Sequence, residues 1–471
     1  MTRKAAIAAF CILPLFVAPF LGVQFAAPIG IFASAVLLWF TEAIPLAATG
    51  LLIPAAVSGF GLMSTQEAFG AFGNTILFLF MGSFFLAAAM QKHGLDKRLA
   101  YFVLTRRIGT ANVRSLLFTF GCIGCFISMW ISNTTACLMM VPIALSIISC
   151  LQPHFADKQH GKNFATKIML LCAFAPSIGG VATPVGSPPN LLAVQFLAEK
   201  GIHLGFAQWA LMGAPLSIVM LCVVFAVLQK MFPTSDIDMK GLRAVLQTQW
   251  QNLGKITTAE IQVVLCFLLA VVLWIVPDML PLLVSDSALV KSLADRMNPA
   301  VVAVACSLIL FILPTGGTAN LTWDDVLGID WGTILLFGGG LCLGTMLMKT
   351  GLAKAIGQEI FGSGQSLILL ISVAVCATTL LSEFSSNTSA AAIMVPILLG
   401  SMGGEHNATL PVFATAMAAS LGFMLPVSTP PNAIVYGTGK VDLKQMMAAG
   451  LALDILGASI VVAAILFYST L

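Results

Sequence analysis

Apolar residues along this chain fall into long runs separated by short polar stretches, and most runs are long enough to cross a bilayer as helices. They predict about eleven crossings. Two further apolar blocks are too long for one crossing. The pattern therefore predicts an all-α polytopic membrane protein. The runs are residues 5–22, 26–43, 45–62, 72–91, 164–183, 207–230, 258–276, 299–313, 331–348, 407–426 and 444–468, and the two long blocks are 113–150 and 365–401.

Each long block contains one copy of a duplicated segment near its middle. Residues 132–142 read SNTTACLMMVP, and residues 386–396 read SNTSAAAIMVP. Each copy places three small polar side chains between apolar stretches, where a polar group needs a partner. A single Ser-Asn-Thr is usually a helix cap or an interhelical hydrogen bond. The duplication instead favours a ligand site built from both copies.

The charges around the first long block predict its path through the membrane. Basic residues flank both of its ends, so the positive-inside tendency places both ends in the cytoplasm. A segment that leaves and returns on one side is a re-entrant helical hairpin, with Ser132, Asn133 and Thr134 near the midplane. Counting crossings from a cytoplasmic N-terminus places the ends of the second hairpin outside. The charges agree less well there, because this count makes Lys349 external and Asp325 internal.

Other segments repeat in the same order. Residues 73–77 resemble residues 332–335, and residues 184–190 (PVGSPPN) match residues 426–432 (PVSTPPN). Three matched blocks in order predict duplicated halves. Because the two hairpins enter from opposite sides, the repeat is expected to be inverted, with its sites meeting at the membrane centre.

The repeated Pro-Pro pairs predict interrupted helices. Proline removes an amide donor and forces the preceding residue out of the helical region, so the crossings break at Ser187 and Thr429. A half-helix then begins with Pro188 or Pro430, capped by Ser187 or Thr429. The breaks free carbonyl oxygens that suit a sodium ion, and the half-helix N-termini attract an anion. Two cation sites around one anion site suit a small dianion carried with sodium.

Composition and charge exclude several classes of protein. Hydrophobic residues make up 59% of the chain, charged residues 9%, and the mean hydropathy is +1.00, which excludes a water-soluble globule. The net charge of +3 without a basic block excludes a nucleic-acid partner. Cys122 and Cys125 have redox spacing, but no second pair matches them. A membrane enzyme would need a carboxylate pair or metal cluster at membrane depth, and the sequence indicates none.

Two acidic residues and one polar segment leave alternatives open. Glu42 ends an apolar run and is either an interfacial residue or a proton relay. Glu383 stands just before the second Ser-Asn-Thr, and tuning of the nearby cation site is as plausible as a structural role. The segment 242–253 predicts an interfacial helix between the halves. The first apolar run resembles a signal peptide but is expected to remain as a helix.

The motifs together resemble those of a known family. Residues 39–45 (WFTEAIP), both Ser-Asn-Thr copies and residues 429–432 (TPPN) are similar to the divalent anion/sodium symporters, which carry dicarboxylates, citrate or sulfate. The resemblance implies a homodimer in which scaffold parts hold a moving, elevator-type transport part. It divides the chain into scaffold at 1–112, transport at 113–231, a cytoplasmic linker at 232–257, scaffold at 258–364 and transport at 365–471.

The resemblance also implies roles for individual residues. Asn133, Thr134, Asn387 and Thr388 would contact the substrate carboxylates, assisted by Ser187, Pro188, Thr429 and Pro430. The first sodium would be held by Ser128, Ser132, Asn133 and the Gly186 carbonyl, and the second by Ser382, Ser385, Asn387 and the Ser428 carbonyl. The chain departs from the family pattern at Ser187, where threonine is common, and at Ser428, where alanine is common.

These observations predict a multi-pass transporter of the inner or plasma membrane that imports a C4-dicarboxylate, such as succinate, fumarate or malate, with two or more sodium ions. The alternatives are a sodium-independent dicarboxylate or citrate antiporter on the same fold, a sulfate carrier, and a passive channel.

Overall fold

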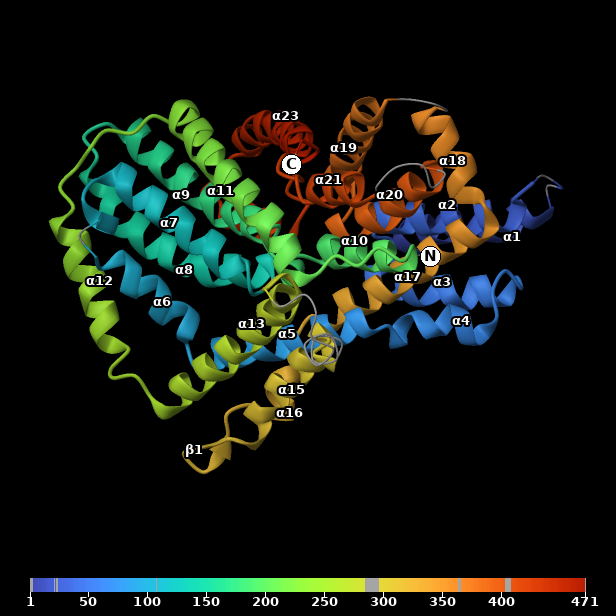
Figure 1. Ribbon diagram of the computed structural model, residues 1–471. Coiled ribbons are helices and arrows are strands. Elements are labelled where there is room, and N and C mark those ends of the chain that lie inside the picture. Colours follow the sequence, from blue (N-terminus) through green and yellow to red (C-terminus); the bar gives the residue numbers. More distant parts are fainter. Residues whose placement is uncertain are drawn as a thin grey trace.

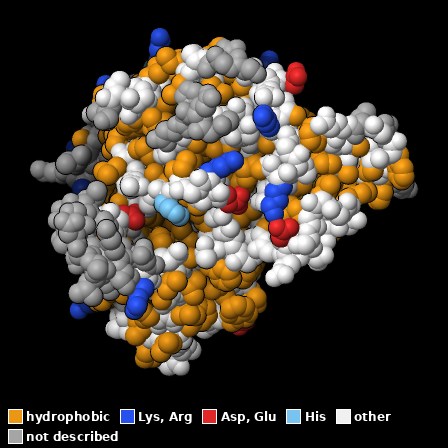
Figure 2. Space-filling view, turned by 45° about the vertical axis from the view of Figure 1, so that its right-hand side comes forward, with side chains coloured by type: hydrophobic (Ala, Val, Ile, Leu, Met, Phe, Trp, Pro, Cys, Tyr) orange, Lys and Arg blue, Asp and Glu red, His pale blue; other side chains and the backbone are white. Residues whose placement is uncertain are grey.

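The protein is almost entirely helical. The computed structural model describes residues 3–20, 22, 24–106, 108–283, 296–362, 366–402 and 408–470. Arg107 and the edges of three predicted apolar segments, at residues 21, 365 and 407, lie outside the described residues. Hydrophobic side chains cover much of the face in Figure 2, and charged side chains on it are sparse, as expected for a protein surrounded by lipid.

The helices of the first half contain one Ser-Asn-Thr turn and one of the two predicted interruptions. They are α1 Arg3–Val17, α2 Ala26–Thr41, α3 Leu46–Gly59, α4 Thr65–Gly70, α5 Thr75–Lys92, α6 Leu95–Leu104, α7 Val113–Ser128, α8 Asn133–Leu151, α9 Lys158–Gly179, α10 Pro188–Glu199, α11 Phe206–Met231 and α12 Lys240–Asn252.

The second half repeats this order. Its helices are α13 Thr258–Leu283, α15 Pro299–Ile312, α16 Trp323–Leu327, α17 Trp331–Thr350, α18 Leu352–Phe361, α19 Leu367–Phe384, α20 Asn387–Ser401, α21 Thr409–Ala419, α22 Pro430–Gly437 and α23 Leu443–Tyr468. A short antiparallel hairpin joins β1 Pro314–Thr315 to β2 Thr318–Ala319.

The apolar pattern located the helices well and their ends less well. Eight helices of the described chain are long and apolar enough to span a membrane, and further apolar helices are shorter. The predicted run 407–426 is wrong as a continuous helix, because α21 ends at Ala419 and a non-helical stretch with turns follows. The run 164–183 likewise loses its last four residues, since α9 ends at Gly179. In both places the chain leaves the helix well before the Pro-Pro pair.

The two halves pack through matched glycines. A Cβ added to Gly82 of α5 would lie 2.6 Å from the Ala303 carbonyl carbon in α15. A Cβ added to Gly339 of α17 would lie 2.4 Å from the Gly50 Cα in α3. These contacts occupy corresponding positions in the two halves. The packing of α5 on α15 thus resembles that of α17 on α3, and the inverted repeat itself stays a prediction.

The helices fall into groups on either side of the molecule. In Figure 1, α7, α8, α9 and α11 gather on one side and α1 to α4 on the other, with α10, α17 and α20 between them. The amphipathic α12 lies at the outer edge beside α6, and its Leu242 and Leu246 are buried. The helix predicted between the halves is thus present, one or two residues from the expected bounds.

Candidate functional site

The first Ser-Asn-Thr copy forms the turn between α7 and α8. Ser132 is the N-cap of α8, where its Oγ accepts a hydrogen bond from the Thr135 amide at 3.3 Å. Ser128, the last residue of α7, donates from its Oγ to Asn133 Oδ1 at 2.7 Å. This bond ties the end of one helix to the start of the next, so the Asn133 side chain has a fixed direction.

The second copy repeats this arrangement between α19 and α20. Ser386 is the N-cap of α20 and accepts from the Ser389 amide at 3.4 Å. The Ser382 Oγ lies 2.9 Å from Asn387 Oδ1 and 2.6 Å from the Ala419 carbonyl oxygen. The same sequence therefore produces the same local structure in both halves.

The two Pro-Pro interruptions also adopt similar geometry. Both half-helices begin at the first proline of the pair, as predicted, and both residues before them are extended. The predicted capping role is present at Thr429, whose Oγ1 accepts from the Asn432 amide at 3.3 Å. It is wrong for Ser187, whose buried Oγ has no partner among the described residues. Ser187 occupies the N-cap position through its backbone alone.

One cavity of about 350 Å³ brings the two turns and the two interruptions together. Residues from the starts of α3 and α17 also line it. No lysine, arginine or histidine lines this cavity in the described part of the chain. The residues from the predicted site are Ser132, Asn133, Thr134, Ser187, Pro188, Ser386, Asn387, Thr388, Ser428, Thr429 and Pro430, and those that the sequence did not indicate include Pro45, Leu46, Ala47, Asp330 and Thr333.

Oxygen atoms of the first predicted cation site crowd around Gly180. A Cβ added to Gly180 would lie 2.2 Å from Asn133 Oδ1 and 2.9 Å from the Gly186 carbonyl oxygen. Ser128 is in contact with Asn133 as described above, whereas the Ser132 hydroxyl donates to Thr135 Oγ1 at 2.9 Å. Three of the four predicted ligands therefore converge, and Ser132 serves mainly as the cap of α8.

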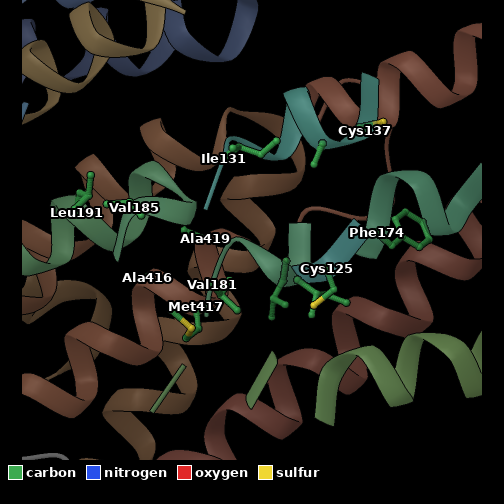
Figure 3. Close-up of a cluster of buried hydrophobic side chains, with 14 of the residues drawn as sticks. Cys125, Ile131, Cys137, Phe174, Val181, Val185, Leu191, Ala416, Met417 and Ala419 are labelled. Carbon is green, nitrogen blue, oxygen red and sulfur yellow. The ribbon is translucent and has the colours of Figure 1, made fainter. Parts of the chain in front are cut away.

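The surroundings of this interruption are apolar. Figure 3 shows Val181 and Val185 on the stretch between α9 and α10, with Cys125 of α7, Cys137 of α8 and Met417 of α21 in the same cluster. All five side chains are buried. Such a shell excludes water and strengthens the interaction of any bound ion with nearby oxygen atoms.

The second predicted cation site is similar but has a carboxylate beside it. A Cβ added to Gly422 would lie 3.3 Å from Ser382 Oγ and 3.2 Å from Ser428 Cβ. The Ser428 Oγ donates to Glu383 Oε2 at 2.7 Å. Ser385 instead donates to the Leu381 carbonyl within its own helix at 2.9 Å. Ser382, Asn387 and Ser428 are thus close together, whereas the Ser385 hydroxyl is engaged in its own helix.

Glu383 fixes the interrupted segment of the second half. Its two carboxyl oxygens accept from the Met424 amide at 2.8 Å and the Leu425 amide at 3.0 Å. With the Ser428 hydroxyl, three donors therefore bind this one carboxyl group. Asp454 of α23, also buried, accepts from the neighbouring Phe423 amide at 3.3 Å. The sequence analysis did not single out Asp454, although an isolated acidic residue in an apolar helix often indicates a functional position.

Comparison with known proteins identifies the family of the chain. The sequence model of the family described as "Sodium:sulfate symporter transmembrane region" matches residues 1–471. The chain belongs to this family. It is also 34% identical over 437 residues to "Sodium-dependent dicarboxylate transporter SdcS" of Staphylococcus aureus (strain USA300), covering 90% of this chain and 82% of the relative. The same identity and coverage hold for SdcS of strain NCTC 8325 / PS 47.

Membership in this symporter family confirms the resemblance seen in the motifs. The protein is a multi-span membrane transporter and not an enzyme, and a plasma-membrane location fits its bacterial relatives. Two solved structures share the fold at low identity. The YdaH transporter of Alcanivorax borkumensis gives a TM-score of 0.52 at 13% identity, covering 92% of this chain and 97% of that one. MtrF of Neisseria gonorrhoeae gives 0.55 at 12%, covering 98% and 93%.

Proposed function

We propose that this symporter family member imports C4-dicarboxylates such as succinate, fumarate or malate together with sodium ions. The proposal rests on the single cavity that joins both Ser-Asn-Thr turns and both interrupted helices. The name of the Staphylococcus aureus relative supports sodium and a dicarboxylate as the transported species.

The chemistry of the cavity supports coupling to a cation. A dicarboxylate carries two negative charges, and the described lining offers no positive side chain to balance them. Four helix N-termini, those of α8, α10, α20 and α22, meet there and contribute partial positive charge. The N-termini of α8 and α20 also present backbone amides, whereas α10 and α22 each begin with two prolines, which have none. Asn133 and Asn387 would each share their side chain between a sodium ion and a substrate carboxylate. Binding of sodium would therefore supply the missing positive charge.

Matched cavities support an elevator mechanism. The lining on the scaffold side includes Leu46 and Ala47 of α3 and Thr333 of α17. A second cavity of about 240 Å³ is lined by their counterparts in the other half, Pro299, Ala300 and Ile76. The two cavities thus lie against equivalent parts of the scaffold. The transport part would expose its binding site beside one of them in each of two conformations. We propose that movement between them carries the substrate across the membrane.

The packing differs between the halves in a way that supports an inward-facing state. A Cβ added to Gly340 of α17 would lie 2.9 Å from Ala392 Cβ in α20, so these helices are closed on each other. The corresponding helices α5 and α8 are separated by a cavity of about 620 Å³, lined by Lys92 and Leu138. With Lys92 at the cytoplasmic side, the binding cavity is open to the cytoplasm.

The homodimer, the domain boundaries at residues 112, 231, 257 and 364, and the number of two or more sodium ions are parts of the same proposal. Each follows from the family resemblance and from the repeat. A sulfate carrier and a sodium-independent antiporter are the outcomes that a transport assay must separate from dicarboxylate symport.

Uptake of labelled succinate into proteoliposomes tests the proposal. We expect accumulation that requires an inward sodium gradient and that unlabelled fumarate and malate reduce. Citrate, sulfate and glutamate serve as competitors. Uptake driven by internal dicarboxylate without sodium would establish the antiporter, and inhibition by sulfate alone would establish the sulfate carrier.

Substitution of the turn asparagines gives the first structural prediction. Asn133→Ala and Asn387→Ala should each abolish sodium-driven succinate uptake, because each removes a group shared by ion and anion. Asn163→Ala is the matched control, since this buried asparagine of α9 bonds to the Pro233 carbonyl and does not line the cavity. Equal amounts of monodisperse protein would establish folding. Wild-type uptake in either turn variant contradicts the assignment.

A further inference from the structure

Two asparagines outside the predicted ligand sets hold the interrupted segments together. Asn190 is the third residue of α10, and its side chain is fully buried. Its Nδ2 donates to the Gly180 carbonyl oxygen at 2.8 Å and to the Thr183 carbonyl oxygen at 2.7 Å. These acceptors lie 10 and 7 residues before Asn190.

The second half contains the same construction. Asn432 is the third residue of α22 and is also fully buried. Its Nδ2 donates to the carbonyl oxygens of Gly422 at 3.1 Å and Leu425 at 3.0 Å, again 10 and 7 residues earlier. The same hydrogen-bond pattern thus occurs in both halves at identical spacing. We therefore expect the two asparagines to have the same function.

The position of these bonds indicates what that task is. The Gly180 and Gly422 carbonyls lie beyond the ends of α9 and α21, where the helical hydrogen bonds stop. The Thr183 and Leu425 carbonyls each accept one backbone amide, that of Gly186 or Ser428. Each asparagine reaches back from the start of the next half-helix and binds two of these carbonyls. One side chain therefore sets the gap between the half-helices. In the first half, the Gly180 carbonyl held by Asn190 lies 2.5 Å from the position of a Cβ on Gly186, whose own carbonyl is a predicted sodium ligand.

Neither asparagine is explained by stability alone. The Oδ1 atoms of Asn190 and Asn432 are buried and have no hydrogen-bond partner among the described residues. An unsatisfied buried acceptor costs about 1–3 kcal/mol. This loss of folding free energy occurs at two matched positions beside the predicted ion sites. The two side-chain amides are therefore expected to have a function other than stabilising the fold.

We infer that Asn190 and Asn432 are positioning residues that set the spacing of the carbonyl oxygens in the two sodium sites, Asn190 for the first and Asn432 for the second. The inference rests on the proposed sodium coupling. It assigns to them the geometry of the ion sites and not direct contact with the substrate.

The substitutions Asn190→Asp and Asn432→Asp test the inference with little change in size. Aspartate cannot donate to two carbonyls and repels them when ionised. Asn190→Ser and Asn432→Ser retain one donor and serve as milder variants if an aspartate variant fails to fold. Asn163→Asp is the control, because Asn163 is a buried asparagine that donates to the Pro233 carbonyl at 2.9 Å, away from the cavity.

The readouts are the sodium concentration for half-maximal succinate uptake and the rise in melting temperature of the purified protein caused by sodium without substrate. We expect each aspartate variant to raise the half-maximal sodium concentration about tenfold, which corresponds to about 1.4 kcal/mol. The succinate KM measured at saturating sodium should change little. The serine variants should be intermediate, and Asn163→Asp should keep the wild-type sodium dependence.

The outcomes distinguish this inference from the proposed function. Wild-type sodium dependence in both aspartate variants overturns the inference and leaves the symporter proposal intact. The aspartate variants could instead lose maximal uptake or stability to the same degree as Asn163→Asp, with an unchanged sodium requirement. That result would show that Asn190 and Asn432 have only a structural role. A wild-type protein whose uptake and melting temperature ignore sodium refutes both.

Discussion

At the scale of residues, the most demanding position near the site is a glycine. Gly180 has no room for a side chain, since a Cβ would lie 2.2 Å from Asn133 Oδ1. Gly180→Ala should therefore displace Asn133 and abolish sodium-driven uptake. Gly241→Ala in α12 is the control, because nothing lies within 4 Å of its added Cβ. That control should transport normally and unfold with a free energy about 0.5–1 kcal/mol higher. Wild-type uptake in Gly180→Ala would show that Asn133 tolerates displacement.

The sequence predicted residues in repeated polar motifs better than isolated ones. Asn133 and Asn387 were found because polar side chains recur between apolar runs, and they do line one cavity. Asn190 and Asn432 stood in the matched PPN segments, but their bonds to distant carbonyls depend on the path of the extended backbone. The hydroxyl of Ser187 was expected to cap α10 and does not, because capping requires a side-chain rotamer that residue type alone does not fix.

At the scale of elements, two ion pairs join the halves in a matched way. Lys92 at the end of α5 pairs with Asp325 of α16 at 2.7 Å, and Lys349 at the end of α17 pairs with Glu67 of α4. Asp325 and Glu67 both occupy the third position of a capping box. Lys349 and Asp325, two of the charges that disagree with the positive-inside count, therefore each have a partner of opposite sign. The counting rule considers charges singly and could not foresee this.

These pairs differ in exposure, which predicts unequal contributions. The side chains of the Lys92 pair are 30% and 23% exposed, against 49% for both members of the Lys349 pair. Lys92→Gln should lower the melting temperature more than Lys349→Gln, and the two effects should add. Thermal unfolding of both variants and the double variant checks this. A larger effect of Lys349→Gln would contradict it.

The Lys92 pair should respond to acid. Burial raises the pKa of Asp325, but the Lys92 ammonium and the Thr322 donors outweigh this and leave the pKa below its usual value. A lowered pKa in the folded state means that the stabilisation is present above the pKa of the unfolded chain and disappears as the pH falls through the folded value. The pair is therefore intact at neutral pH, and the difference between wild type and Lys92→Gln should shrink in acid.

At the scale of the whole molecule, the unequal closure of the halves predicts reciprocal accessibility. Leu138 of α8 is 55% exposed and lines the cavity toward Lys92, whereas its counterpart Ala392 of α20 is 1% exposed. In a background without the native cysteines, Leu138→Cys should react with an impermeant thiol reagent from the cytoplasmic side. Ala392→Cys should react with the reagent from the external side. It should do so only in molecules in which the cysteine of Leu138→Cys is inaccessible to the reagent. Simultaneous full labelling of both positions would exclude the alternating movement.

The absence of any positive side chain in the described lining of the central cavity has a consequence for leakage. A diacid that arrives alone finds helix dipoles and the Asp330 carboxylate but no positive side chain, and the dipoles are too weak to hold two charges in a place shielded from water. A dicarboxylate bound without sodium therefore dissociates before the protein changes conformation, and it is rarely transported. A permanently charged lysine there would bind the diacid whether or not sodium is present. Transport would then be uncoupled from the sodium gradient, and the protein would only equilibrate the diacid across the membrane.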